Sequence, residues 1–382
     1  LSEKSDAFNM YTAIDYIRWR GGISLEACPF NEVDYYVLCK LCCLDLQGIV
    51  PPPGGGEGVT VKYAVDSFFE IHRGERVNLG ALVAKEVIIA CRLMAEAPRF
   101  RDMKVYAYAN NIDETKEEQF CALTIEPGDG TLYITFRGTD DTIVAWKENF
   151  KMSYCDEVPA QHDAARYLTR TASGSAKPIR VGGHSKGGNL SVYAAMKCPK
   201  DIQDRIIEIY NFDGPGFGKS VVQEPAYQCI RDRITTLLPQ TPVVGVLMEH
   251  EESFEVTKSE AFGPFQHNGF RWEVEGPSFV RLGSVSGGGR YLNDRLGEWV
   301  DSVDMEQRRI FVNTLFDVLQ STGAKTLTEL SDAKLRSART IIRTTRGLDP
   351  ETRAVLIRTI WLLMKLLVTF KRSSKSQECA AC

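Results

Sequence analysis

The sequence lacks the excess of positive charge that a nucleic-acid surface needs. It has 46 lysines and arginines against 50 aspartates and glutamates, which gives a net charge of −4 and a pI near 5.9. Because binding to phosphates depends on a basic field, no nucleic-acid partner is expected. The composition is otherwise that of a globular protein, with 43% hydrophobic and 25% charged residues.

A complete metal-binding pattern is also missing. Cys39 and Cys42 form one C-x-x-C pair in YYVLCKLCCLDL, but no second pair and no suitably spaced histidines accompany it. A structural zinc ion takes four ligands, so these thiols are expected to be buried in an apolar helix. No metal and no cofactor are therefore expected. The eleven cysteines are an odd number scattered through apolar segments, which favours a reducing cytoplasm.

Neither a signal peptide nor a membrane-spanning helix is expected. The first ten residues, LSEKSDAFNM, are polar. The most apolar segment, AVLIRTIWLLMKLLVTF at 354–370, is short for a spanning helix and is interrupted by Arg358 and Lys365. We interpret it as a packed or dimer-forming helix, with peripheral membrane contact through an amphipathic face as the alternative.

Changes in composition divide the chain into three segments. Residues 1–100 are expected to form a helical N-terminal segment that packs on the core, broken by IVPPPGGGEG at 49–58. Residues 101–285 alternate β-rich and helical runs, and PGDG at 127–130 joins two β-rich runs as a tight hairpin. Residues 286–382 are expected to be helical. The alternation predicts an α/β fold with a mostly parallel central sheet and helices on both faces.

The glycine-rich stretch VGGHSKGGNL at 181–190 lacks the order of a phosphate-binding loop. Such a loop needs Gly-Lys followed by Ser or Thr, whereas the order here is Ser185-Lys186-Gly187. The pattern G-x-S-x-G fits instead. The apolar run PIRVGG precedes it and the small-residue helical run KGGNLSVYAAMK follows it, which is the context of a nucleophile elbow. Ser185 is therefore the candidate nucleophile.

Histidine is scarce, and only five residues can supply the base that a serine nucleophile needs. His72 and His162 precede the nucleophile, and His184 adjoins it and is expected to point elsewhere. His250 lies in the acidic stretch MEHEES, which is expected to be solvated. His267, in the loop AFGPFQHNGF, is where the chain order Ser–acid–His delivers a base. An ordinary surface histidine is its alternative interpretation.

The candidate acid is Asp213, which ends the apolar run IIEIYNFD. A carboxylate at this point is expected to accept the imidazole N–H and hold its tautomer. A capping role in the following turn is the alternative, because Asp-Gly often caps a turn. Glu249, Glu251 and Glu252 are the competing carboxylates.

Thr139 and Lys186 are the candidate oxyanion-hole residues. The run TLYITFRGTDD at 131–141 places Thr139 just past a strand end, and the Lys186 N–H directly follows the nucleophile. Arg137 is expected to brace this loop. The adjacent pair at 140 and 141 is acidic, but no further ligand cluster supports a metal there.

These motifs together resemble a known family. FRGT followed by Trp146, GHSKGG, FDGPGF and a late QH resemble the class 3, fungal-lipase-like branch of the α/β-hydrolases, over about residues 104–275. The whole chain, including QHNGFRW, resembles a bacterial lipase-like group within that branch. The resemblance implies an α/β-hydrolase fold, here with additional helical termini. It also implies Ser185 as nucleophile, His267 as base, and Thr139 with Lys186 as the oxyanion hole.

The acid departs from this resemblance. Class 3 lipases usually carry it after the next strand, but the corresponding stretch LLPQTPVVG at 237–245 has no carboxylate. Asp213 lies one strand earlier, a placement that resembles pancreatic-type lipases. The resemblance to class 3 lipases therefore does not identify the triad acid.

The expected function is a serine hydrolase that cleaves carboxylic esters through an acyl-enzyme. Its expected substrate is a small-molecule or lipid ester with an apolar acyl group. Cleavage of thioesters or amides and transfer of the acyl group use the same residues, and they stay open. The rival interpretation is a catalytically silent hydrolase-fold protein whose helical termini mediate binding.

Overall fold

A nine-stranded sheet runs through the part of the chain that the computed structural model describes, residues 10–80, 83–286, 303–358 and 360–361. Its strand order is β1-β2-β3-β4-β5-β6-β7-β8-β11. Strands β4 to β8 pair in parallel, whereas β1 to β4 and the last pair, β8 with β11, are antiparallel. The bounds are Val59–Thr60 (β1), Lys104–Asp113 (β2), Glu118–Glu126 (β3), Leu132–Phe136 (β4), Ile179–His184 (β5), Ile206–Phe212 (β6), Ile234–Pro239 (β7), Phe254–Thr257 (β8) and Arg281–Leu282 (β11). A separate two-stranded ribbon consists of β9 (Val274–Glu275) and β10 (Ser278–Phe279).

The mixed α/β architecture confirms the prediction from sequence. Residues 206–212 form a strand and 186–197 a helix, as predicted, and PGDG joins β3 to β4 with Ile125 opposite Tyr133. Within residues 1–100, which were expected to be helical, the last helix is Glu86–Glu96. Residues 350–358, 360 and 361 are helical, while the rest of the apolar segment 354–370 lies outside the described residues. No helix in the described ranges is long and apolar enough to cross a membrane.

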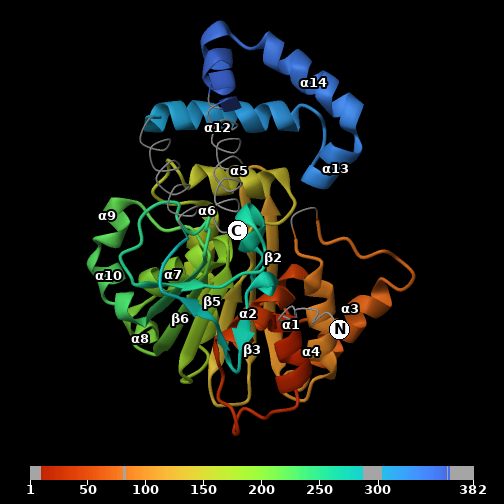
Figure 1. Cartoon of the computed structure of the whole chain (residues 1–382), viewed down its shortest axis with the longest axis vertical. Helices are drawn as coiled ribbons and strands as arrows, with labels where there is room; N and C mark the ends of the chain where they lie inside the picture. Colours follow the sequence, from red (N-terminus) through yellow and green to blue (C-terminus); the bar gives the residue numbers. More distant parts are fainter. Residues whose placement is uncertain (1–9, 81–82, 287–302, 359, 362–382) are drawn as a thin grey trace, which may run out of the picture.

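Helices cover both faces of the sheet (Figure 1). Successive residues of a strand point to opposite faces, so apolar residues at both kinds of position form a core on each face. Tyr133 belongs to the core on one face and Ile134 to the core on the other. The first face is covered by α1 (Ala13–Arg20), α2 (Glu32–Cys39), α3 (Val61–Ile71) and α4 (Glu86–Glu96), with the 3-10 turn Lys40–Cys43. The second face is covered by α6 (Pro159–Ala172) and α7 (Lys186–Lys197), with α8 (Lys200–Gln203), α9 (Lys219–Val222) and α10 (Pro225–Gln228) nearby.

A third core lies beyond the sheet, between α5 and the C-terminal helices. Ile143 of α5 (Ile143–Lys151) is buried with Phe311 and Phe316 of α12 (Met305–Gln320). The chain continues through α13 (Leu327–Asp332) and α14 (Lys334–Gly347). In Figure 1, α12 and α14 lie above α5, and α13 lies to its right. We call residues 303–361 the C-terminal lobe.

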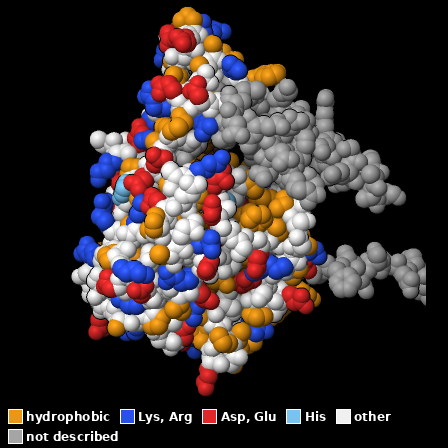
Figure 2. Space-filling model, turned by 90° about the vertical axis from the view of Figure 1, so that its left-hand side faces the viewer, with side chains coloured by type: hydrophobic (Ala, Val, Ile, Leu, Met, Phe, Trp, Pro, Cys, Tyr) orange, Lys and Arg blue, Asp and Glu red, His pale blue; other side chains and the backbone are white. Residues whose placement is uncertain are grey.

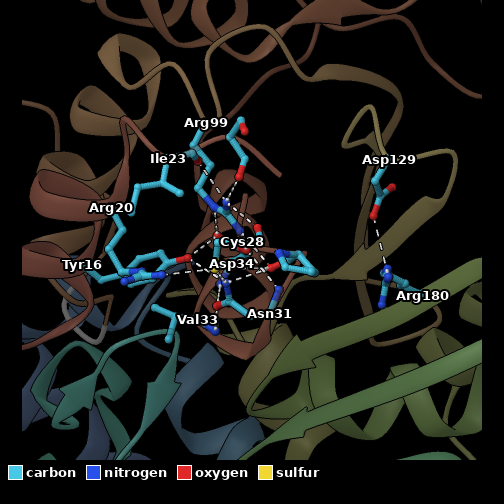
Figure 3. A network of polar contacts seen from close by, with 12 residues as sticks. Tyr16, Arg20, Ile23, Cys28, Asn31, Val33, Asp34, Arg99, Asp129 and Arg180 are labelled. Carbon is cyan, nitrogen blue, oxygen red and sulfur yellow. Dashed lines mark hydrogen bonds and ion pairs between the residues drawn. The ribbon is translucent and has the colours of Figure 1, made fainter. Parts of the chain in front are cut away.

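A buried ion pair ties the N-terminal helices together (Figure 3). The Arg99 guanidinium donates to both carboxylate oxygens of Asp34, at 2.8 and 2.5 Å, and both side chains are fully buried. Its remaining N–H groups donate to backbone carbonyls such as those of Ile23 and Cys28. The Tyr16 hydroxyl adds a hydrogen bond of 2.9 Å to Asp34. The network therefore joins α1, α2 and the segment after α4.

Replacing Arg99 by methionine is expected to destabilise the protein by about 3–5 kcal/mol, because the Asp34 carboxylate would remain buried without its counter-charge. Urea denaturation measures the free energy of unfolding. Arg101→Met is the matched control, since Arg101 pairs with Asp102 at the surface and surface pairs contribute little. Equal stability of both variants would contradict the account.

Candidate active site

Ser185 lies at the turn between β5 and α7, as the elbow prediction requires. Its φ of 60° and ψ of −134° put a non-glycine residue in the strained left-handed half of backbone space. The flanking glycines allow the strand and the helix to approach closely. A Cβ on Gly183 would stand 2.5 Å from the Gly187 carbonyl, and one on Gly187 would overlap the Phe136 carbonyl oxygen. The local sequence therefore holds a half-buried serine at the tip of a tight turn.

Asp213 and His267, which are 54 residues apart in the chain, meet in a hydrogen bond of 2.6 Å between Oδ2 and Nδ1. The Asp213 side chain is fully buried, whereas 27% of the His267 side chain is exposed. Because the carboxylate accepts, Nδ1 carries the proton and Nε2 keeps its lone pair. The pair thus presents a histidine with an accessible basic nitrogen.

The acid is itself fixed by its surroundings. Asp213 follows β6 with a φ of 50°, and its backbone N–H donates to the Leu237 carbonyl at 2.9 Å. The Gly245 N–H donates to its second oxygen at 3.0 Å. Gly245 lies in the loop after β7, the place that lacks a carboxylate in this sequence. That loop therefore supports the acid through its backbone, a role that sequence reasoning missed.

Among the described residues, no hydrogen bond joins the Ser185 hydroxyl to His267. The two are linked through His184, whose ring centre lies 4.5 Å from that of His267. His184 Nε2 is 2.7 Å from the His267 carbonyl oxygen, and since a carbonyl only accepts, Nε2–H is the donor. Burial, followed by the charges of Lys40 and His267, lowers the pKa of His184 well below its usual 6.5. Neutral His184 therefore holds the histidine loop beside the serine.

The predicted oxyanion residues lie against the nucleophile. A Cβ on Gly138 would come within 3.1 Å of Ser185 Cβ, so the loop that carries Thr139 touches the elbow. The Thr139 hydroxyl is buried and has no hydrogen-bond partner within the described ranges. Lys186 is the first residue of α7, a position whose N–H has no partner within the helix. Thr139 and Lys186 thus each carry a donor without a partner among the described residues, next to the elbow.

Arg137 braces this loop, as predicted. Its guanidinium donates to Asp140 at 2.8 Å and to Asn110 at 3.1 Å. The other oxygen of Asp140 accepts from the Thr142 N–H at 2.9 Å, and the Asp141 carboxylate accepts from the Thr328 N–H at 3.1 Å. Both carboxylates therefore accept hydrogen bonds from protein groups. In the described part of the chain, no group of His, Cys, Asp or Glu residues is arranged to hold a metal ion.

The Lys186 side chain points away from the elbow and forms a buried ion pair that sequence reasoning missed. Its ammonium donates to Glu148 at 2.8 Å and to the Gln119 carbonyl at 2.7 Å, and the lysine and glutamate side chains are fully buried. Glu148 also accepts from the Ala160 N–H at 2.9 Å. The pair joins α7 to β3, α5 and α6. The only sequence signal was a lysine at the start of a small-residue helix.

Comparison with known families gives a match to the Mbeg1-like family over residues 94–317, more than half of the chain. The chain belongs to the Mbeg1-like family. This is a lipase-like family. A solved fungal lipase–inhibitor complex, described as a model for interfacial activation in lipases, is 15% identical over 44% of this chain and 68% of that chain, with a TM-score of 0.32. No curated protein matches.

The N-terminal helices of this Mbeg1-like chain support the histidine loop. A Cβ on Gly269 would stand 2.5 Å from Tyr36 of α2, so the ring packs directly against that loop. The Tyr36 ring centre also lies 5.2 Å from that of Phe270 and 5.8 Å from that of His184. Sequence reasoning assigned the N-terminal segment no part in the site. In the structure, Tyr36 of α2 packs against His184 and against the loop after His267.

The acidic stretch around His250 was predicted to be solvated; this holds for Glu249, Glu251 and Ser253, which are exposed, but not for the side chains of His250 and Glu252. The Glu252 side chain is buried and accepts hydrogen bonds from His250 Nδ1 at 2.9 Å, from the Thr236 hydroxyl at 2.5 Å and from the Tyr227 hydroxyl. These hydrogen bonds hold the Glu252 side chain in the interior. The apolar periodicity of the sequence gives no indication of such polar contacts. Glu252 therefore pairs with His250, and Asp213 is the carboxylate that contacts His267.

Glu252 makes the stability of this Mbeg1-like chain depend on pH. Burial opposes its charge, but the hydrogen bond and charge of His250 and the two hydroxyls hold its pKa at about 2, below the usual 4.5. The folded state thus binds the proton more weakly than the unfolded state, and stability is lost as pH falls from 4.5 towards 2. Between pH 6 and pH 3, the wild type is expected to lose about 2 kcal/mol more than Glu252→Gln in urea denaturation. Parallel losses would contradict this.

A cavity of about 770 Å³ opens beside Gly245 on the far side of the acid. Its walls include Leu238, Val256 and Leu282, with His250 and Arg281 as polar members. Neither Ser185 nor His267 lines it. This cavity therefore borders the loop that supports the acid, and neither the candidate nucleophile nor the candidate base is among its lining residues.

Proposed function

We propose that this Mbeg1-like chain is a serine hydrolase with an α/β-hydrolase fold that cleaves carboxylic esters through an acyl-enzyme. The observation that carries the proposal is the Asp213–His267 hydrogen bond of 2.6 Å, formed beside an elbow serine with a φ of 60°. Strained residues of this kind concentrate at functional sites. The family, a lipase-like one, supports the same assignment.

The proposed first half-reaction forms the acyl-enzyme. His267 Nε2 takes the Ser185 hydroxyl proton as Oγ attacks the ester carbonyl carbon. The resulting oxyanion accepts hydrogen bonds from the N–H groups of Thr139 and Lys186, each contributing about 3 kcal/mol to the transition state. As the tetrahedral intermediate collapses, His267 returns its proton to the leaving alkoxide. The products are an alcohol and an ester of Ser185.

Water completes the proposed cycle. His267 removes a proton from water as its oxygen attacks the acyl carbon, and then returns that proton to Ser185 Oγ as the acyl bond breaks. A carboxylic acid leaves. Throughout, Asp213 keeps the proton of His267 on Nδ1 and stabilises the imidazolium that forms transiently. No residue needs a metal or a cofactor for these steps.

A small-molecule or lipid ester with an apolar acyl group is the proposed substrate. Thioesters, amides and transfer of the acyl group to another acceptor would use the same residues. A reducing compartment such as the cytoplasm is the proposed location, because Cys42 and Cys121 lie next to each other as buried, unbridged thiols. The rival function is that of a binding protein without catalytic activity. In that case the hydrogen-bond donors around Ser185 would take part in no reaction.

A series of p-nitrophenyl esters of increasing acyl length tests the proposal, with acyl thioesters assayed in parallel. We expect a burst of p-nitrophenol that is stoichiometric with enzyme, followed by slower turnover, since acylation precedes deacylation. The chain length with the highest kcat/KM defines the acyl preference. Absence of both burst and turnover at every length, for oxygen and thioesters alike, would favour the scaffold.

His184→Phe is expected to lower kcat by about 10–100-fold with KM nearly unchanged. The variant keeps the ring but loses the hydrogen bond to the His267 carbonyl, and small displacements of a catalytic group cost rates of this size. His184→Gln, whose amide N–H can donate, should recover part of the loss. Steady-state kinetics separate kcat from KM. A kcat within twofold of wild type in His184→Phe would remove His184 as a positioning residue.

A further inference from the structure

The C-terminal lobe carries a local excess of positive charge. Residues 333–361 contain seven lysines and arginines and two acids, a net charge of +5 in a chain whose total is −4. On the face that Figure 2 shows, basic and acidic side chains are otherwise interspersed, so the excess of positive charge belongs to residues 333–361 in particular. The described arginines of this stretch make no ion pair with any described residue. They are Arg336, Arg339, Arg343, Arg346, Arg353 and Arg358.

The arginines of α14 lie on one face of the helix. Positions 336, 339, 343 and 346 are separated by three, four and three residues, which places them along one side of an α-helix. All four are exposed, and Ile342, which borders this face, is 51% exposed. On the opposite side, Ser337 is buried and Ile341 packs against the core of the lobe. The helix therefore turns its basic face outward.

The helical residues that follow add an apolar stripe. A shallow groove of about 510 Å³ runs along one side of 350–361. Ile357 and Trp361, which line it, are 54% and 60% exposed. Arg353 and Arg358 line the same groove. Apolar side chains thus alternate with arginines on an outer surface of the lobe.

The lobe is attached to the loop that holds the predicted oxyanion donor. Thr142 and Thr326 form a β-bridge, and the Ile143 N–H donates to the Lys325 carbonyl at 2.9 Å. The Thr328 N–H donates to the Asp141 carboxylate at 3.1 Å. These contacts lie at the end of β4 from which the Thr139 loop emerges, and Figure 1 shows the lobe on that side of the sheet. The lobe is therefore joined directly to the loop beside the candidate active site.

We propose that the arginine face of α14, together with the apolar stripe of 350–361, binds an anionic lipid surface. Arginines attract anionic headgroups, each adding about fivefold to the partition coefficient, while exposed isoleucine and tryptophan insert at the level of the headgroups. The exposed aliphatic side chains of Ile342 and Ile357 favour lipid over nucleic acid, which would need polar or stacking side chains at these positions. The proposal does not depend on the proposed hydrolase activity.

Sedimentation with vesicles tests the proposal on the full chain. We expect binding to vesicles of phosphatidylglycerol and phosphatidylcholine in equal parts, little binding to phosphatidylcholine alone, and release by high salt. The variant R336Q/R339Q/R343Q/R346Q should bind at least about 100-fold more weakly. Arg18, Arg73, Arg101 and Arg231 are surface arginines of the body paired with acids. Their combined change to glutamine removes the same charge and should leave binding close to wild type.

A second variant separates the lipid surface from other anions. I342S/I357S keeps every charge, and it should weaken vesicle binding about tenfold or more while leaving binding to RNA unchanged. Equal vesicle binding by wild type and the arginine variant would overturn the proposal, as would binding to RNA but not to vesicles. Labelling of Ser185 by a fluorophosphonate in solution should be the same in all variants. A failed vesicle experiment with intact labelling would therefore leave the proposed hydrolase untouched.

Discussion

Ser185→Ala is expected to lower ester turnover by about 10⁶-fold, because it removes the atom that forms the acyl bond. The residual rate would come from the oxyanion donors and from substrate binding alone. Turnover of a p-nitrophenyl ester measures the loss, and the burst of the first turnover should vanish with it. The elbow turn itself should survive, since its shape depends on Gly183 and Gly187 and on the packing of α7 against β5.

The control for this experiment is Ser220→Ala, which changes an exposed serine after the β6 turn. It should turn over ester at the wild-type rate. Thermal unfolding should show that both alanine variants remain folded. A Ser185→Ala protein that is folded and retains even one hundredth of the wild-type kcat would assign the chemistry to another nucleophile.

Asp213→Asn is expected to lower kcat by about 10⁴-fold with the fold retained. An asparagine can donate its N–H₂ to His267 Nδ1, which stabilises the wrong tautomer and places the proton on Nε2. The histidine then has no lone pair facing Ser185. The hydrogen bond from the Gly245 N–H to Asp213 Oδ1 can persist with the amide oxygen, so the loop after β7 has no reason to move.

Glu252→Gln is the matched comparison for the acid. It also neutralises a buried carboxylate that contacts a histidine, but that histidine is His250. Glu252→Gln should therefore lower stability while leaving kcat close to wild type, the opposite of Asp213→Asn. If Glu252→Gln abolished turnover while Asp213→Asn did not, the assignment of the acid would be reversed.

Local sequence was sufficient to predict the elements that position Ser185 and Asp213. The strand before Ser185, the helix after it and the strand that ends just before Asp213 all read as clear apolar or small-residue runs, and the structure has a strand, a helix and a strand there. Such runs are predictable because parallel strands buried on both faces are nearly continuous in apolar residues. Chain order alone then pointed to His267, whose loop the structure brings to Asp213.

The features that the sequence did not reveal depend on contacts between distant segments. Nothing near Glu252 indicates that Tyr227 and Thr236 will satisfy its carboxylate, and nothing near Gly245 indicates that its N–H will reach Asp213. Tyr36 supports the loop after His267 from a helix more than two hundred residues away in the chain. Contacts of this kind leave no periodic pattern in the sequence, because each one involves single residues and not a repeating face of a helix or strand.

We propose that Ser185 is a nucleophile activated by His267 and Asp213. Reaction of the intact protein with a fluorophosphonate, followed by mass spectrometry of the peptides, tests it most directly. We predict one adduct per chain, on the peptide that contains Ser185, with no adduct in Ser185→Ala and much slower labelling in Asp213→Asn. An unlabelled wild-type protein, or labelling that persists unchanged in Ser185→Ala, would contradict the account.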